Sequence, residues 1–249
     1  MTELKRTNSF DDNPQVKEFR EKLYDNVEKE MYEFFPTCVL EMDKLIKSGL
    51  FDQSPSSIYC TLPSGVENGP HSENNEDHLP SKKRKLDDIS VSLCPTGTTN
   101  TVNYPCNKKL KEVIAVLKPH IITLIEKCAE LKLWIELKIP KIEDGNNFGV
   151  SIQEDILSEV TKLEGDTGSY LEQITRYYTT RGKMMSKLVK YPQLEDYRKA
   201  IEEYDEKIYF SLKLITMELR NTYCILHDLI TKNIEKLKRP RSSNTDSMY

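Results

Sequence analysis

Several features are scarce or missing in this sequence of 249 residues, and each absence disfavours a class of protein. Only 9 glycines and one tryptophan are present, which disfavours glycine-rich phosphate-binding folds and β-rich folds with many tight turns. No apolar run approaches the about 20 residues that a membrane-spanning helix needs. The first 14 residues contain no apolar segment, so we expect neither a secretory signal nor a membrane partner.

Catalytic and metal-binding motifs are missing as well. The six cysteines include no Cys-x-x-Cys pair, which disfavours a zinc ribbon. Because we expect no secretory signal, we expect the cysteines to be reduced thiols in a cytosolic or nuclear protein. The sequence has no His-x-x-x-His, nucleophile-elbow or P-loop motif. Cys224 and His227 are three positions apart in a predicted helix, which indicates packing on one helix face rather than a catalytic dyad. We therefore assign no catalytic residue, no metal and no cofactor, and predict that the chain is not an enzyme.

What the sequence does contain is charge spread along amphipathic segments. Charged residues make up 31% and apolar residues 37%, as expected for long helices that bury only one stripe. The formal net charge of −4 disfavours nucleic acid as a partner. Apolar residues recur every three or four positions over residues 14–49, 105–138, 151–190 and 193–238, which predicts four long helices.

Local signals support these boundaries. Asn13 and Pro14 suit the start of the first helix, and Ser151 opens a Ser-x-x-Glu capping box for the third. Pro36 and Pro119 fall inside the pattern and predict bends, because proline removes a backbone donor. Only Tyr191–Pro192 separates the last two helices, so we expect them to be antiparallel.

These elements predict an all-α fold, an up-down four-helix bundle that forms a single domain over residues 1–249. A loop over 139–150 and a tail over 239–249 remain outside the helices. Aromatic residues away from the main stripes, such as Tyr209, indicate a second buried face and lateral assembly with other copies of the chain.

Residues 50–104 differ from the rest, because nearly half of them are Ser, Pro, Gly, Thr or Asn. Such a segment buries too little apolar surface to offset its ordering entropy, so we expect a long disordered loop between the first and second helices. The cluster Lys82, Lys83, Arg84 and Lys85 lies inside it. Four consecutive cations on an accessible chain favour nuclear localisation through an import receptor, with a solubilising charge run as the alternative.

The loop over 139–150 and the tail each allow two interpretations. The loop contains two glycines and two asparagines, and it is either a functional loop or an ordinary connection capped by Ser151. Cations between Lys232 and Arg241 complement a helix C-terminus, and a polar segment then ends in Met248–Tyr249. This tail is either a docking peptide, held through its carboxylate and last side chains, or a frayed end.

Three long segments resemble one known family. They are IPKIEDGNNFGVSIQEDI from residue 139, SYLEQITRYYTTRGKMMSKLVKYPQLEDYRKAIEEYDEKIY from residue 169, and ELRNTYCILHDLITKNIEKLKRPRSSN from residue 218. All three are similar to the 11S proteasome activator (REG) family. The segments KKRKLD and KRPRSSN resemble its gamma-type, nuclear subunit.

The resemblance implies a non-catalytic protein that caps the 20S proteasome without ATP or ubiquitin. Family members assemble as homoheptameric rings and admit peptides and unfolded proteins through a channel. Their C-termini insert between subunits of the proteasome α-ring, and the loop between the second and third helices opens the gate. We expect the protein in the nucleus, with the cytoplasm as a second compartment.

Carried onto this sequence, the resemblance assigns two sets of residues. The activation loop is Glu143, Asp144, Gly145, Asn146, Asn147, Phe148, Gly149 and Val150. The proteasome-docking residues are Ser247, Met248 and Tyr249. The alternative function is a nuclear helical scaffold that acts by lateral helix–helix interaction, for which the C-terminus would be dispensable.

Overall fold

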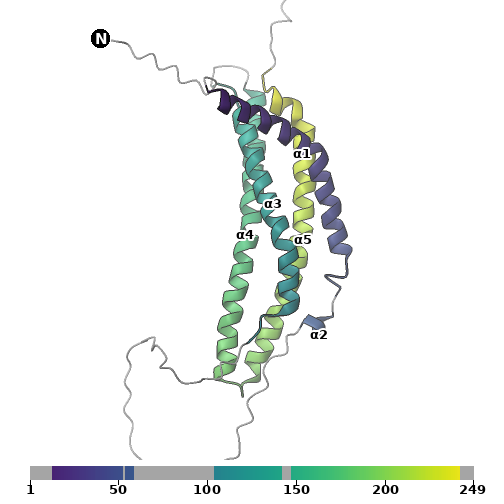
Figure 1. Ribbon diagram of the computed structural model, residues 1–249, viewed down its shortest axis with the longest axis vertical. Helices are drawn as coiled ribbons and strands as arrows, with labels where there is room; N and C mark the ends of the chain where they lie inside the picture. The colour runs from purple at the N-terminus through teal and green to yellow at the C-terminus, as the bar shows by residue number, and fades with distance from the viewer. Residues whose placement is uncertain (1–12, 53, 59–103, 142–146, 242–249) are drawn as a thin grey trace, which may run out of the picture.

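A computed structural model describes residues 13–52, 54–58, 104–141 and 147–241. Within these ranges the chain is helical, and no β-strand occurs. The helices are α1 (Pro14–Lys47), α2 (Pro55–Ile58), α3 (Lys108–Lys138), α4 (Phe148–Lys190) and α5 (Glu195–Lys238). Figure 1 shows α3, α4 and α5 running side by side along the long axis, with α1 beside α5. The predicted four-helix bundle is therefore confirmed.

One continuous apolar core joins the four long helices. Its largest fully buried side chains include Trp134 and Leu131 of α3, Tyr177 of α4 and Tyr223 of α5. The apolar stripe of each helix faces this core because a period of 3.6 residues places such side chains on one face. No helix in the described ranges is long and apolar enough to cross a membrane.

Helix α1 changes direction along its length (Figure 1). Its first half crosses the end of the bundle where α3 ends, and its second half descends beside α5. The Asn13 side chain caps the helix by accepting from the Gln15 N–H at 2.9 Å. Pro36 lies inside the helix, where the missing N–H removes one backbone hydrogen bond and makes bending easier.

Several boundaries differ from the sequence prediction. Helix α1 ends at Lys47 instead of residue 49, α3 begins at Lys108 instead of 105, and α5 begins at Glu195 instead of 193. Helix α4 begins at Phe148 instead of Ser151, so Phe148, Gly149 and Val150 are helical and not part of a loop. The capping box at Ser151 is not used, because Asn147 occupies the N-cap position. The extra turn is favoured by tertiary contacts to the end of α5, which a local pattern does not reveal.

The start of the long segment over 50–104 is ordered in part. Phe51 and Ile58 are buried in the core, and Ile58 is the last residue of α2. The Tyr209 hydroxyl donates to the Leu50 carbonyl at 2.7 Å, and its ring lies 6.0 Å from that of Phe51. These long-range contacts with α5 order residues whose local composition predicts a loop. Lys82–Lys85 lie outside the described residues.

Candidate functional site

Three chain segments converge at one end of the bundle: the end of α3, the start of α4 and the end of α5 (Figure 1). We call this the loop-and-tail end, because the predicted activation loop follows α3 and the predicted docking tail follows α5. Both segments therefore leave the bundle at the same place.

Gln153 connects two of these helix ends to α4. Its amide Nε2 donates to the Leu237 carbonyl at 2.8 Å and to the Lys138 carbonyl at 3.2 Å. Lys138 is the last residue of α3, and Leu237 is next to the last of α5. Carbonyls in the last turn of a helix have no intrahelical donor, so a side-chain donor from elsewhere satisfies them. Gln153 is fully buried.

Gly149 brings the backbones of α4 and the tail into contact. A Cβ atom built on Gly149 would lie 1.9 Å from the Pro240 carbonyl oxygen, a distance that no real contact shows. Only glycine allows this approach. Beyond it, the Arg241 guanidinium donates to the Asn147 side-chain oxygen at 3.2 Å. The first turn of α4 is thus paired with Pro240 and Arg241, which we call the root of the tail.

Helix α1 contacts the end of α3 and the end of α5. The Tyr24 hydroxyl donates to the Leu137 carbonyl at 3.2 Å, and the Lys138 ammonium lies 3.7 Å from the centre of the Tyr24 ring. Glu28 pairs with Lys238 at 2.7 Å. Burial lowers the pKa of Lys138; the charge of Glu28 opposes this, and that of Lys238 adds to it.

The predicted site residues fall into two groups. Asn147 and Phe148 are exposed, with 72% of Phe148 accessible, whereas Gly149 is buried and Val150 half-buried. The remaining predictions lie outside the described residues: Glu143, Asp144, Gly145, Asn146, Ser247, Met248, Tyr249 and the cluster at Lys82–Lys85. The structure places the root of the loop next to the root of the tail.

Sequence reasoning missed Gln153. A signal was present, because Gln153 shares the apolar stripe of α4 with Ile156 and Val160, and a glutamine on such a stripe needs buried partners. Those partners are backbone carbonyls of two other helices, which no sequence pattern identifies.

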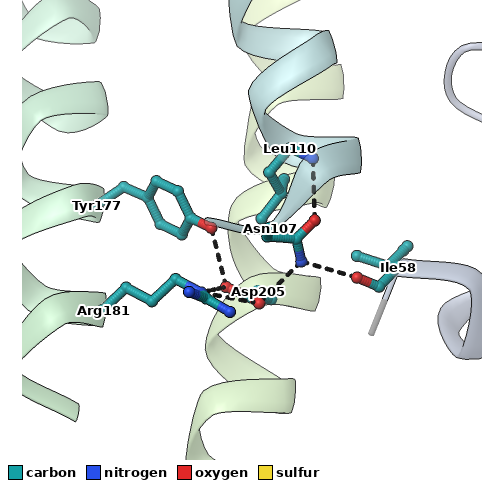
Figure 2. A network of polar contacts seen from close by, with 6 residues as sticks. All are labelled: Ile58, Asn107, Leu110, Tyr177, Arg181 and Asp205. Atoms are coloured by element: carbon teal, nitrogen blue, oxygen red, sulfur yellow. Dashed lines mark hydrogen bonds and ion pairs between the residues drawn. The ribbon is translucent and has the colours of Figure 1, made fainter. Parts of the chain in front are cut away.

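A second buried polar cluster lies in the opposite half of the bundle (Figure 2). Asp205 of α5 accepts from the Arg181 Nε and the Tyr177 hydroxyl, each at 3.0 Å, and from the Asn107 amide at 2.8 Å. Asn107 also donates to the Ile58 carbonyl at 2.8 Å and caps α3. This cluster joins the two ends of segment 59–103. The described ranges hold no group of three or more His, Cys, Asp or Glu residues suited to a metal ion.

Comparison with known proteins decides the family. The model for the C-terminal part of proteasome activator PA28 matches residues 103–247, and that for the N-terminal part matches residues 11–62. The chain belongs to the PA28 proteasome activator family. The expected 11S resemblance is thereby confirmed, including its gamma-type character. The human protein named proteasome activator complex subunit 3 is 44% identical over 245 residues, covering 94% of each chain.

Solved structures show the same fold. The 11S subunit of the Plasmodium falciparum proteasome, PA28, is 27% identical and superposes with a TM-score of 0.69 over 97% of this chain and 99% of that one. A further structural neighbour is the activator PA26 of Trypanosome brucei, solved in complex with the yeast 20S proteasome. It is 16% identical, with a TM-score of 0.53 over 95% and 99% of the two chains, and therefore supports the fold alone.

Proposed function

We propose that this PA28 family member is a non-catalytic cap of the 20S proteasome that acts without ATP or ubiquitin. The C-terminal residues Ser247–Tyr249 dock on the proteasome α-ring, and the loop of residues 143–147 with the first turn of α4 opens the gate. One observation carries the proposal: the roots of loop and tail lie side by side at one end of the bundle. A single face of the activator can therefore engage the proteasome through both segments.

Ring assembly makes short tails sufficient for docking. We propose a homoheptamer, in which each bound tail raises the effective concentration of the next, so that weak contacts together hold the cap. An exposed apolar stripe on α5 supports lateral contact between copies, with 60% of Phe210, 44% of Leu214 and 49% of Ile225 accessible in the single chain. Peptides and unfolded proteins are the proposed substrates that pass through the channel.

Gate opening requires that the loop bind the open state of the gate better than the closed state. The exposed Phe148 ring, at the first position of α4, is placed to contribute apolar contact to that interaction. The Asn and Gly residues before it provide compact hydrogen bonding and backbone freedom.

The test is hydrolysis of a fluorogenic peptide by latent 20S particles, with the native mass of the activator measured on the same sample. We expect the full-length ring to stimulate hydrolysis, and deletion of Met248–Tyr249 to abolish stimulation while the ring persists. Asn146→Ala should bind the proteasome but stimulate less. A truncated ring that stimulates fully would refute the docking role of the C-terminus, and a full-length ring that never stimulates would favour the scaffold alternative.

We also propose nuclear import through Lys82–Lys85. Replacing these four residues by alanine in a fluorescent fusion should shift the protein to the cytoplasm. Unchanged nuclear accumulation would show that the cluster is a solubilising charge run.

A further inference from the structure

We propose that Gln153 is a positioning residue that couples tail docking to gate opening by fixing the distance between the roots of the tail and the activation loop. This inference rests on the proposed function. It assigns a role to a residue that is fully buried and belongs to neither the loop nor the tail.

The geometry makes Gln153 a shared anchor. Lys138 and Leu237 lie in the last helical turns before the loop and the tail, and one amide group binds the carbonyls of both. A terminal amide has two N–H donors, so both bonds can form at once. Gln153 and Leu237 are both buried, so the Leu237 carbonyl has no access to water as a replacement if it loses this donor. The two helix ends are thus held to α4 and to each other.

Two further contacts extend the anchor toward the surface. Gln153 binds Leu237, Gly149 contacts Pro240, and Asn147 binds Arg241. Along α4 these residues run from Gln153 back to Asn147, while their partners run from Leu237 on to Arg241. The start of α4 and the root of the tail are therefore antiparallel. A displacement of the tail root therefore moves the residues that enter the loop.

This arrangement has a consequence for gating beyond stability. A docked ring is held at the tips of its tails, so the positions of the loops depend on the connection between tail root and loop root. If that connection is loose, each loop samples several positions, and only a fraction of them favour the open gate. Weakening the anchor should lower the maximal stimulation and leave tail docking nearly unchanged.

The decisive variant is Gln153→Met, which removes the two donors and keeps the length and approximate volume of the side chain. Its matched control is Gln173→Met on the same helix. Gln173 also bonds α5, through the Ser211 hydroxyl at 2.6 Å, but it lies about 30 Å along α4 from Gln153. Full-length rings of both variants are titrated against latent 20S particles in the fluorogenic-peptide assay, with native mass and melting temperature measured in parallel.

For Gln153→Met we expect maximal stimulation to fall about three- to tenfold. A factor of this size corresponds to the free energy of roughly one net hydrogen bond, lost from the stabilisation of the open gate. The ring concentration for half-maximal stimulation should stay within about twofold of wild type, because the tails that determine docking are intact. Gln173→Met should match wild type in both measurements.

A second variant covers the case in which Gln153→Met does not assemble. Arg241→Ala removes the outermost contact of the anchor, the bond at 3.2 Å to the Asn147 side chain, and changes no residue of the predicted loop or docking end. The tail lies outside the helices at this point, so the bundle can keep its fold while the anchor opens. We expect the same loss of maximal stimulation.

The outcomes separate the two proposals. Wild-type rings that leave the proteasome silent overturn the proposed function and this inference together. Active wild-type rings with unchanged maximal stimulation in the assembled variant overturn the inference alone. A variant that only requires a higher concentration, or that loses stimulation in proportion to ring dissociation, also overturns it, because Gln153 would then be merely structural.

Discussion

Asp205 is the residue on which the largest buried polar cluster of the described chain depends. It is 1% exposed and pairs with Arg181, which is 6% exposed. Removing one partner of a buried ion pair leaves an uncompensated charge, whereas exposed pairs contribute little. An ion pair of α4 therefore matters much more for stability where it is buried, as at Arg181, than where it is exposed.

We expect Asp205→Asn to lower the free energy of unfolding by about 3 kcal/mol, because Arg181 stays buried without its counter-ion. Urea denaturation of the purified protein measures this. The control is Glu172→Gln, which breaks a pair with Arg176 that is about 70% exposed on both sides. That variant should change stability by less than about 0.5 kcal/mol. Similar losses in the two variants would contradict the assignment.

The buried thiols give a prediction on pH. Burial raises the pKa of Cys128 from 9.0 to about 12 and that of Cys38 from 9.0 to about 11. Above pH 9 the unfolded chain therefore releases thiol protons that the folded chain retains, and the free energy of unfolding falls as pH rises toward these values. Below pH 9 this contribution is fully present.

A labelling experiment checks the same environments. At pH 8 we expect a thiol reagent to modify the exposed Cys224 of the native protein while Cys38 and Cys128 stay protected, as read by peptide mass mapping. Both protected residues should react in urea. Rapid labelling of Cys128 under native conditions would show that its surroundings are open.

At the scale of elements, α1 acts as a brace across the loop-and-tail end. Tyr24 and Glu28 contact the last turns of α3 and α5, which precede the predicted activation loop and the predicted docking tail. Neither residue attracts attention in the sequence, because an aromatic and an acidic residue on an amphipathic helix are common.

Glu28→Gln should loosen the end of α5 without unfolding the bundle. The pair with Lys238 is about one third exposed on each side, so its loss should cost less than about 1 kcal/mol globally. Amide hydrogen exchange should speed up locally in the last turn of α5. Glu18→Gln, which breaks a pair within α1, is the control, and equal exchange at α5 in both variants would argue against a brace.

The helices themselves could be predicted from the sequence, but some of their ends could not. Apolar periodicity places the four long helices, since a stripe of buried side chains must recur every three or four residues. It fails at the start of α4, where Gly149 contacts Pro240, and at α2, where packing of Phe51 and Ile58 orders a polar segment. Both exceptions depend on partners far away in sequence.

For the whole molecule, the cluster around Asp205 closes the base of segment 59–103. The Asn107 amide lies 2.8 Å from the Ile58 carbonyl, so the ends of the segment are already adjacent. We expect a Gly-Ser linker of about 10 residues to replace it and to keep or slightly raise stability, because a shorter loop costs less closure entropy.

The melting temperature and the peptide-hydrolysis assay test this replacement. Stimulation of the proteasome should persist, since the loop-and-tail end lies in the other half of the bundle. Nuclear import should be lost together with Lys82–Lys85. Failure to fold would mean that the segment contributes to the core beyond Ile58.

The sequence by itself determined the all-α class, the four long helices and, through extended similarity, the PA28 family. Through that similarity it also predicted an activation loop and a docking tail. Only the tertiary structure decided that Gln153, Gly149 and Tyr24 link their roots. These links join residues 15 to 113 positions apart through backbone carbonyls. Because backbone carbonyls are the same in every residue, no pattern of side chains encodes such links.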